Sequence, residues 1–334
     1  MMTQLYPLTF DPVFQSYIWG GRNLESRLGR KIPPGVVAES WEISGHADAP
    51  THVANGPLAG QSLPQLLEAL GEQLVGSRSR DMLARGKFPL LVKLLDANQP
   101  LSVQVHPNND YAHVHENGDL GKTEMWYILH AEPGAELIYG LKPNVTPALF
   151  RRQLQAGALE NCLHRLPVKA GDAVFIPAGS IHAIMDGIVL AEIQQSSNTT
   201  YRVYDWNRVD ASGKSRPLHI DKAMDVINFE QVEPGPFPPQ VVETGPGLER
   251  AIISQSNYFV VERLTFEQPG AFAGHCDGST FEIWGAMQGS GQIQWAGEPL
   301  SLAAVHFALL PAALGQFEIS AEQPSQWLRA YVPA

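Results

Sequence analysis

The sequence predicts an all-β fold of two domains with a few short helices. The chain has 334 residues, more than the roughly 100 to 200 of an ordinary domain. Its 30 glycines and 26 prolines are spread along the chain, and short apolar runs such as 188–193 and 292–295 recur between them. This spacing of turn residues and apolar runs is typical of β-sandwiches and barrels.

Helical signals occur in three short segments. Ser62 can cap a helix over 62–70, in which a proline comes early and leucines recur at helical spacing. Thr146 begins a second segment of the same kind over 146–154, and residues 221–229 form the third. We therefore expect a few short helices within a β-protein.

A proline-rich stretch separates the two predicted domains. Residues 233–240 are rich in proline, which cannot donate to a sheet and favours stiff, extended chain. A β-like pattern continues from about residue 250 to the C-terminus. The sequence predicts a first domain over 1–232, a linker over 233–248 and a second β-domain over 249–334.

Charge and cysteine content exclude several classes of protein. With 23 basic and 34 acidic residues, the formal charge of -11 has the wrong sign for a protein of nucleic acid or anionic membranes. Cys162 and Cys276 are too few for a disulfide framework or a zinc ribbon. The sequence has no signal-peptide pattern and no long apolar segment. We expect a soluble, cytoplasmic protein whose partner is a small molecule.

The first polar cluster lies in Leu101-Ser-Val-Gln-Val-His-Pro107. Alternation along a strand places Ser102, Gln104 and His106 on one face. On the inner face of a small barrel such a stripe needs partners, and a metal ion is an efficient one. A solvent-facing strand gives the same pattern, so the stripe alone leaves both interpretations open.

The second cluster lies in residues 171–182, where a turn leads into an apolar strand and a Pro177-Ala-Gly179 turn then presents His182. The spacing of the glycine, proline, glycine and histidine is similar to the second conserved motif of cupins. Cupins that have lost their metal keep the glycine–proline frame, so the motif indicates the fold more strongly than the metal. The resemblance implies two cupin-type jelly-roll domains.

A third segment, Gly121-Lys-Thr-Glu-Met-Trp-Tyr-Ile128, places Lys122 and Glu124 on one strand face. A carboxylate, two imidazoles and a neutral amide oxygen make a ligand set suited to zinc, with a position left for water or substrate. We therefore predict one Zn²⁺ per chain, held by Gln104, His106, Glu124 and His182.

Together these segments resemble the signature segments of type I phosphomannose isomerases, in the same order from about residue 5 to 230. Trp19-Gly-Gly21 and residues 38–44 and 88–96 resemble further segments of that family. In the family the four positions named above bind zinc, and the enzyme interconverts mannose 6-phosphate and fructose 6-phosphate. The short stretch between Glu124 and Gly171 resembles the short bacterial branch, which lacks a helical insertion.

One segment departs from the family pattern. Longer members have Ser-Asp-Asn after the strand that holds Glu192, and this chain has Ser197-Asn198-Thr199. An aspartate proposed as a base in that stretch has no counterpart here, so Asn198 cannot take that role. Arg202 matches an active-site arginine of the family.

The resemblance implies proton transfer between C1 and C2 through a cis-enediol, with zinc stabilising the oxyanion. Candidates for the base are Lys122, Glu192 and a metal-bound water. A neighbouring divalent cation favours the neutral form of Lys122. Glu192 lies in an apolar strand, where a carboxylate is either functional or paired with Lys122 or Arg202, and both interpretations stay open.

Four residues are predicted to bind substrate. Lys93 lies inside an apolar strand, so it either reaches an internal anion or lies on an exposed face, and we favour the interior. Arg202 can grip a phosphate with two N–H donors, and Ser102 can add a hydroxyl. Trp19, unlike Trp126, which is expected in the core, is the candidate platform for the sugar.

The other histidines are expected to be surface or structural residues. His113 and His115 fall in a predicted surface loop, and the C-terminal domain has His275 and His306 without a second Gln-x-His strand. We expect that domain to be cupin-like and metal-free.

Two rival functions remain open. A cupin oxygenase is one, because two histidines and a carboxylate also suit non-haem iron. A sugar-phosphate-binding protein without catalysis is the other. Gln104 and the cations Lys93, Lys122 and Arg202 favour the isomerase, and both a monomer and a homodimer stay open.

Overall fold

The structure, a computed structural model, describes residues 4–209 and 213–334. Strands dominate and the helices are short, as predicted. The chain forms two compact units. The terminal unit comprises Met1–Phe14, Ser40–Lys93 and Phe237–Ala334, and the central unit comprises Gln15–Glu39 and Leu94–Pro236.

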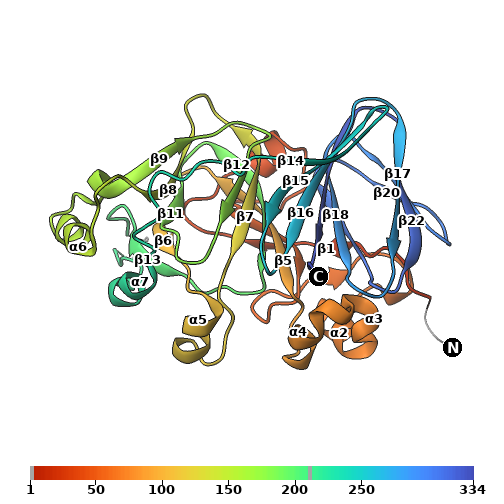
Figure 1. The fold of residues 1–334 in the computed structure, drawn as a ribbon, viewed down its shortest axis with the longest axis horizontal. Coiled ribbons are helices and arrows are strands. Elements are labelled where there is room, and N and C mark those ends of the chain that lie inside the picture. Colours follow the sequence, from red (N-terminus) through yellow and green to blue (C-terminus); the bar gives the residue numbers. More distant parts are fainter. Residues whose placement is uncertain (1–3, 210–212) are drawn as a thin grey trace. The chain divides into compact units, whose positions relative to one another are not determined.

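The central unit contains two sheets that pack face to face (Figure 1). The first has the order β10 (Ala173–Ile176), β7 (Glu124–Ala131), β12 (Ile188–Gln195) and the second half of β5 (Leu90–Ala97). The second has the order β13 (Tyr201–Tyr204), β6 (Val103–Val105), β11 (His182–Ile184), β8 (Glu136–Leu141) and β9 (Leu163–Pro167). One hydrophobic cluster joins the two sheets through residues such as Trp126, Leu137, Ile184 and Leu190.

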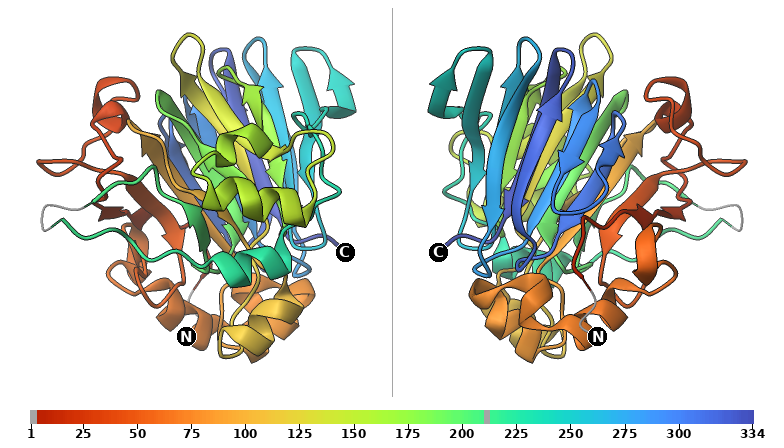
Figure 2. Two further views of the ribbon diagram at one scale, coloured as in Figure 1. Left: turned by 90° about the vertical axis from the view of Figure 1, so that its left-hand side faces the viewer. Right: turned by 90° about the vertical axis from the view of Figure 1, so that its right-hand side faces the viewer.

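Helices cover the other face of the second sheet. Helix α6 (Pro147–Gln155) contributes Phe150 and helix α7 (Ile220–Val226) contributes Ala223 to a cluster with Val103 and Val105 of β6. Figure 2 shows α6 and α7 in front of the strands of this unit in its left view. Because Val103 and Val105 face these helices, the alternation along β6 turns Gln104 toward the space between the sheets. The inner-face interpretation of the polar stripe is thus confirmed.

The terminal unit contains a second pair of sheets. One has the order β14 (Gln240–Gly245), β15 (Leu248–Gln255), β16 (Val260–Phe266), β23 (Ser325–Tyr331), β18 (Glu282–Gln288) and β21 (His306–Leu310). The other has the order β17 (Gly270–Cys276), β22 (Gly315–Ala321), β19 (Gly291–Gln294) and β20 (Leu300–Leu302). Side chains of both sheets, including Phe272, Trp284, Phe317 and Trp327, form one core.

Shorter elements complete the two units. The terminal unit also holds β1 (Phe10–Asp11), β4 (His52–Val53), most of β2 (Val13–Gln15) and β3 (Glu39–Ser44), the first half of β5, and helices α2 (Leu63–Leu70), α3 (Glu72–Val75) and α4 (Arg80–Ala84). The central unit also holds α1 (Asn23–Ser26) and α5 (Asn109–His115).

All three predicted helices are confirmed. Helix α2 begins after Ser62, whose side chain accepts from the Gln65 backbone while Gln65 caps the Ser62 amide in return. Thr146 caps α6 in the predicted way. The predicted loop around His113 and His115 is wrong, because Asn108 accepts from the Tyr111 amide and begins helix α5 there. Both histidines are exposed on that helix.

The compact units divide the chain differently from the predicted domains. Residues 40–93 belong with the C-terminal strands and not with the metal-ligand candidates. The predicted linker over 233–248 contains β14, which begins after the last proline of the run and pairs with β15. Composition located the proline run but could not show long-range pairing of the segments around it. None of the described helices is long and apolar enough to cross a bilayer.

Candidate active site

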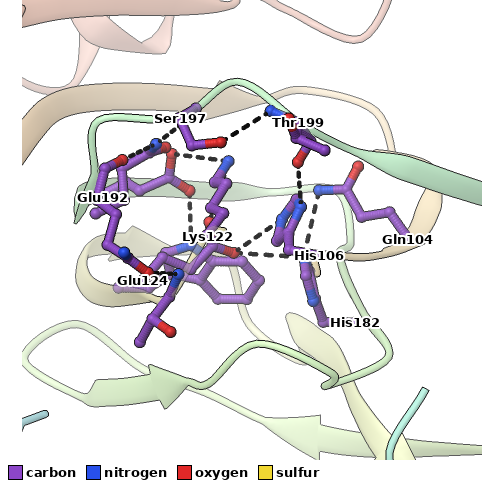
Figure 3. Close-up of polar contacts among 12 residues, drawn as sticks. Gln104, His106, Lys122, Glu124, His182, Glu192, Ser197 and Thr199 are labelled. Carbon is purple, nitrogen blue, oxygen red and sulfur yellow. Dashed lines mark hydrogen bonds and ion pairs between the residues drawn. The ribbon is translucent and has the colours of Figure 1, made fainter. Parts of the chain in front are cut away.

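The four predicted metal ligands meet in the central unit, between its two sheets (Figure 3). Glu124 is the first residue of β7 in one sheet, and His182 is the first residue of β11 in the other. Gln104 on β6 lies directly opposite His182, and His106 follows the end of β6. The structure therefore brings Gln104 and His106 together with His182, which follows the predicted turn. Glu124 joins them from the facing sheet.

Three donor atoms lie close enough to share one ion. Glu124 Oε1 lies 3.3 Å from His182 Nε2 and 3.6 Å from His106 Nε2, and all three atoms lie within 4.8 Å of one another. In a tetrahedral zinc site, ligand distances of about 2.0–2.1 Å place neighbouring ligand atoms roughly 3.3 Å apart. Among the described residues, His106, Glu124 and His182 are the group of three histidine, cysteine or acidic side chains that lie close enough together to hold a metal ion.

Backbone carbonyls fix the tautomers of both histidines. His106 Nδ1 lies 2.8 Å from the Thr199 carbonyl, and His182 Nδ1 lies 2.9 Å from the Ser180 carbonyl. Because a carbonyl only accepts, each Nδ1 carries the proton and each Nε2 presents a lone pair to Glu124. Carbonyls that orient metal-binding imidazoles in this way are usual around bound metals.

Several of the converging atoms have no hydrogen-bond partner in the part of the chain that the structure describes. Both Glu124 carboxylate oxygens and His106 Nε2 are buried without a hydrogen-bond partner among the described residues. Burial lowers the pKa of His106, and it lowers the pKa of His182 to about 3, so both rings are neutral near pH 7. Burial raises the pKa of Glu124, but the positive charge of Lys122 beside it opposes this effect, and the pKa of Glu124 lies below its ordinary value. These lone pairs have no hydrogen-bond donor within the described ranges, and a bound cation would accept them. The residues therefore fit a divalent metal ion.

The Gln104 amide completes the set. Its Nε2 lies 3.3 Å from His182 Nε2, and its Oε1 accepts from the Ser102 hydroxyl at 3.3 Å. A half-turn of the amide exchanges Oε1 and Nε2, which places an oxygen ligand beside the His182 imidazole.

Two glycines of the recognised motifs allow the segments to approach each other. Gly179 has a φ of +88°, and its amide donates to the His106 carbonyl at 2.8 Å. A Cβ on Gly121 would lie 2.3 Å from the Asn108 carbonyl carbon, so only glycine lets the Lys122 segment lie against the chain after His106.

Lys122 and Glu192 are buried beside the candidate metal ligands. Lys122 Nζ lies 3.2 Å from Glu124 Oε2 and 3.9 Å from Glu192 Oε1. Burial lowers the pKa of Lys122, but the carboxylates of Glu124, Glu192 and Glu39 outweigh it and raise that pKa above its ordinary value. Glu192 is therefore both paired and adjacent to the site, so the two sequence-based interpretations of it do not exclude each other.

Arg202 and Ser102 extend the site along the inner face of the second sheet. Arg202 Nε donates to Ser102 Oγ at 3.2 Å, and its NH1 donates to the Pro217 carbonyl at 3.1 Å. Nearby Asp205 is paired with Arg208 and Arg216. Among the described residues no carboxylate pairs with Arg202, whose pKa is lowered by burial and by Arg216. Its guanidinium keeps donors for an anionic ligand.

The remaining two candidates lie in other surroundings. Trp19 is 3% exposed and packs in the hydrophobic core of the central unit, stacked on Tyr17. This packing does not support the predicted role of Trp19 as a sugar platform. Lys93 is buried as predicted, but it belongs to the terminal unit, with Nζ 4.4 Å from the ring centroid of Trp41.

Three contributions to the site were missed by the reasoning from sequence. Thr199 and Ser180 act through their carbonyls, which any residue possesses. Trp126, expected only in the core, donates its indole N–H to Glu192 Oε2 at 2.8 Å. Its spacing of two from Glu124 was the available signal, since it places both side chains on one face of β7.

Two facing β-sheets that enclose a histidine–glutamate–histidine cluster and a buried lysine–glutamate pair define a β-sheet enzyme with a candidate metal centre. Residues 8–129 match the family model described as phosphomannose isomerase type I, catalytic domain. The chain belongs to the type I phosphomannose isomerases and is an isomerase. The family predicted from the sequence motifs is thereby confirmed.

Relatives match over most of the chain. A Bacillus subtilis protein described as probable mannose-6-phosphate isomerase GmuF is 41% identical over 94% of this chain and 96% of its own length. A mannose-6-phosphate isomerase of Streptococcus mutans is 42% identical over 76% of this chain and 77% of its own. The crystal structure of the Bacillus subtilis mannose 6-phosphate isomerase superposes with a TM-score of 0.86 at 33% identity, covering 97% of this chain and 99% of that one.

Proposed function

We propose that this isomerase interconverts mannose 6-phosphate and fructose 6-phosphate through a cis-enediol and uses one zinc ion per chain. The convergence of His106 Nε2, His182 Nε2 and Glu124 Oε1 carries the proposal, because two of these three buried atoms, His106 Nε2 and Glu124 Oε1, have no hydrogen-bond partner among the described residues. The names of the relatives supply the substrate.

Gln104, His106, Glu124 and His182 are the residues that would hold the metal. Two imidazoles with a carboxylate and an amide oxygen are ligands that zinc accepts in catalytic sites. When bound, zinc supplies Lewis acidity that stabilises negative charge on the substrate oxygens at C1 and C2.

The chain's own residues would bind the phosphate and move the proton. We assign Arg202 to the phosphate, with Ser102 holding the guanidinium and the Gln104 amide in one hydrogen-bonded row. Lys122 and Glu192 are the candidate groups for proton transfer between C1 and C2, because both are buried and their charged atoms lie 3.9 Å apart.

A coupled isomerase assay tests this proposal. We expect turnover of mannose 6-phosphate by zinc-loaded protein, loss of turnover after chelation, and recovery when zinc is returned. Binding of mannose 6-phosphate without turnover would favour the sugar-phosphate-binding alternative, and oxygen consumption would favour the oxygenase.

Arg202→Lys should raise the KM for mannose 6-phosphate by roughly 10- to 100-fold, because lysine keeps the charge but loses the two-pronged geometry and charged hydrogen bonds contribute about 1.5–3 kcal/mol. Inhibition by inorganic phosphate should weaken in parallel. Steady-state kinetics would measure both, with the exposed Arg165→Lys as the control. Equal losses on mannose 6-phosphate and on free mannose would place Arg202 at the reacting carbons instead.

The finer architecture is also a proposal. We assign both pairs of facing sheets to cupin-type jelly rolls, and we assign no metal to the C-terminal strands. Metal analysis should then give one ion per chain, and a second ion lost on His275→Ala would contradict this.

A further inference from the structure

Trp126 contacts two parts of the candidate active site at once. Its indole N–H donates to Glu192 Oε2 at 2.8 Å, and its ring lies edge-on to the His182 ring at a centroid distance of 5.4 Å. The side chain is 1% exposed. Trp126 and Glu192 are direct cross-strand partners on β7 and β12, so the backbone register holds the pair together.

The contact distinguishes the two oxygens of Glu192. Oε2 receives the indole proton, while Oε1 lies 3.9 Å from Lys122 Nζ. A carboxylate free to rotate would exchange these oxygens. A carboxylate that is held by a buried hydrogen-bond donor keeps the same oxygen facing Lys122.

The same indole separates this polar group from the apolar interior. Trp126 is part of the hydrophobic cluster that includes Ile128, Val174 and Leu190. Its ring packs in the core while its N–H faces the site, so movement of the ring would disturb Glu192 and His182 together.

We propose that Trp126 is a positioning residue for catalysis, which fixes the Glu192 carboxylate so that Oε1 faces Lys122 and the substrate. This proposal rests on the proposed isomerase function and adds to it a residue that acts through Glu192. Misplacing a reacting group by about 1 Å can cost 10²-fold in rate. The effect should therefore appear in kcat more than in KM.

The terminal unit contains a matched arrangement that serves as an internal control. Trp284 is fully buried and donates its indole N–H to Glu282 Oε2 at 2.8 Å. Glu282 is paired with Arg329, which also lies 3.2 Å from Glu262. Both units thus place a cation between two carboxylates and an indole on one of them, but the candidate metal ligands lie in the central unit.

The experiment compares Trp126→Phe, Trp284→Phe, Glu192→Gln and the double variant Trp126→Phe/Glu192→Gln, all in the full-length protein. Phenylalanine keeps an aromatic ring and removes the N–H donor. We expect Trp126→Phe to lower kcat by roughly 10- to 100-fold, to change KM by less than about twofold, and to retain the wild-type metal content. Trp284→Phe should lower the melting temperature without lowering kcat.

The double variant separates positioning from general damage. If Trp126 acts through Glu192, Trp126→Phe should lower kcat by less than about threefold in the Glu192→Gln background. The same 10- to 100-fold loss in both backgrounds, or a Trp126→Phe kcat within twofold of wild type, would overturn the proposal. Wild-type protein without isomerase activity would refute the proposed function itself, an outcome distinct from both.

Discussion

His182→Ala should abolish metal binding and lower isomerase activity by roughly 10³-fold or more, because a metal that polarises substrate oxygens contributes several kcal/mol to the barrier. His182 and Glu124 belong to facing sheets, so the variant removes one half of the bridge between them. His106→Ala should behave in the same way. Metal analysis of purified protein and the coupled assay would measure the two losses.

Thermal stability gives a readout independent of activity. A ligand present at 100 times its dissociation constant stabilises the folded state by about 2.7 kcal/mol. Wild-type protein should therefore melt at a higher temperature with zinc than with a chelator, and His182→Ala should lose this difference. His130→Ala is the matched control, since His130 pairs with Glu132 at the surface of the same unit. Full metal content in His182→Ala would remove this residue from the site.

Local sequence patterns predicted which side chains share a strand face and where a turn lies better than they predicted how the compact units divide the chain. The period of two along β6 determines which side chains share a face, and Val103 and Val105 on the opposite face confirm it. The Pro177-Ala-Gly179 turn requires a left-handed glycine, which fixes where His182 emerges. These features depend on a few neighbouring residues and are therefore visible in sequence.

The remaining features depend on pairing between distant segments. Residues 40–93 group with the C-terminal strands, and no local sequence pattern indicates this grouping. Strand β14 begins directly after a proline run that resembles a linker. The Trp126–Glu192 contact requires the register of β7 against β12. Thr199 orients His106 through a carbonyl, so its side chain type carries no information about that role.

Lys122→Met should abolish proton exchange between substrate and solvent while metal and substrate still bind, if Lys122 is the base. Loss of a general base typically costs 10²- to 10⁴-fold. In heavy water, wild-type enzyme should introduce deuterium at C1 or C2 during turnover, which NMR detects. Lys142→Met, at an exposed lysine that contacts the Glu160 carbonyl, is the control.

The charges around Lys122 make its ability to act as a base depend on bound metal. Its neighbouring carboxylates raise its pKa in the free protein, and an ammonium cannot accept a proton. Positive charge held at Glu124 opposes the charge on Nζ and lowers that pKa. A base at Lys122 should therefore work only in metal-loaded protein, with a rate that rises with pH as the amine loses its proton.

Glu192→Gln distinguishes the two candidates, because it removes one carboxylate that raises the pKa of Lys122. If Lys122 is the base, exchange in Glu192→Gln should be slow but measurable, and the rising limb of its pH profile should move to lower pH. Misplacement of substrate alone costs about a hundredfold, which overlaps the range for loss of a base, so the rate by itself cannot decide. The presence or absence of deuterium exchange can distinguish the two residues. Robust deuterium incorporation by Lys122→Met, together with none by Glu192→Gln, would assign the proton to Glu192.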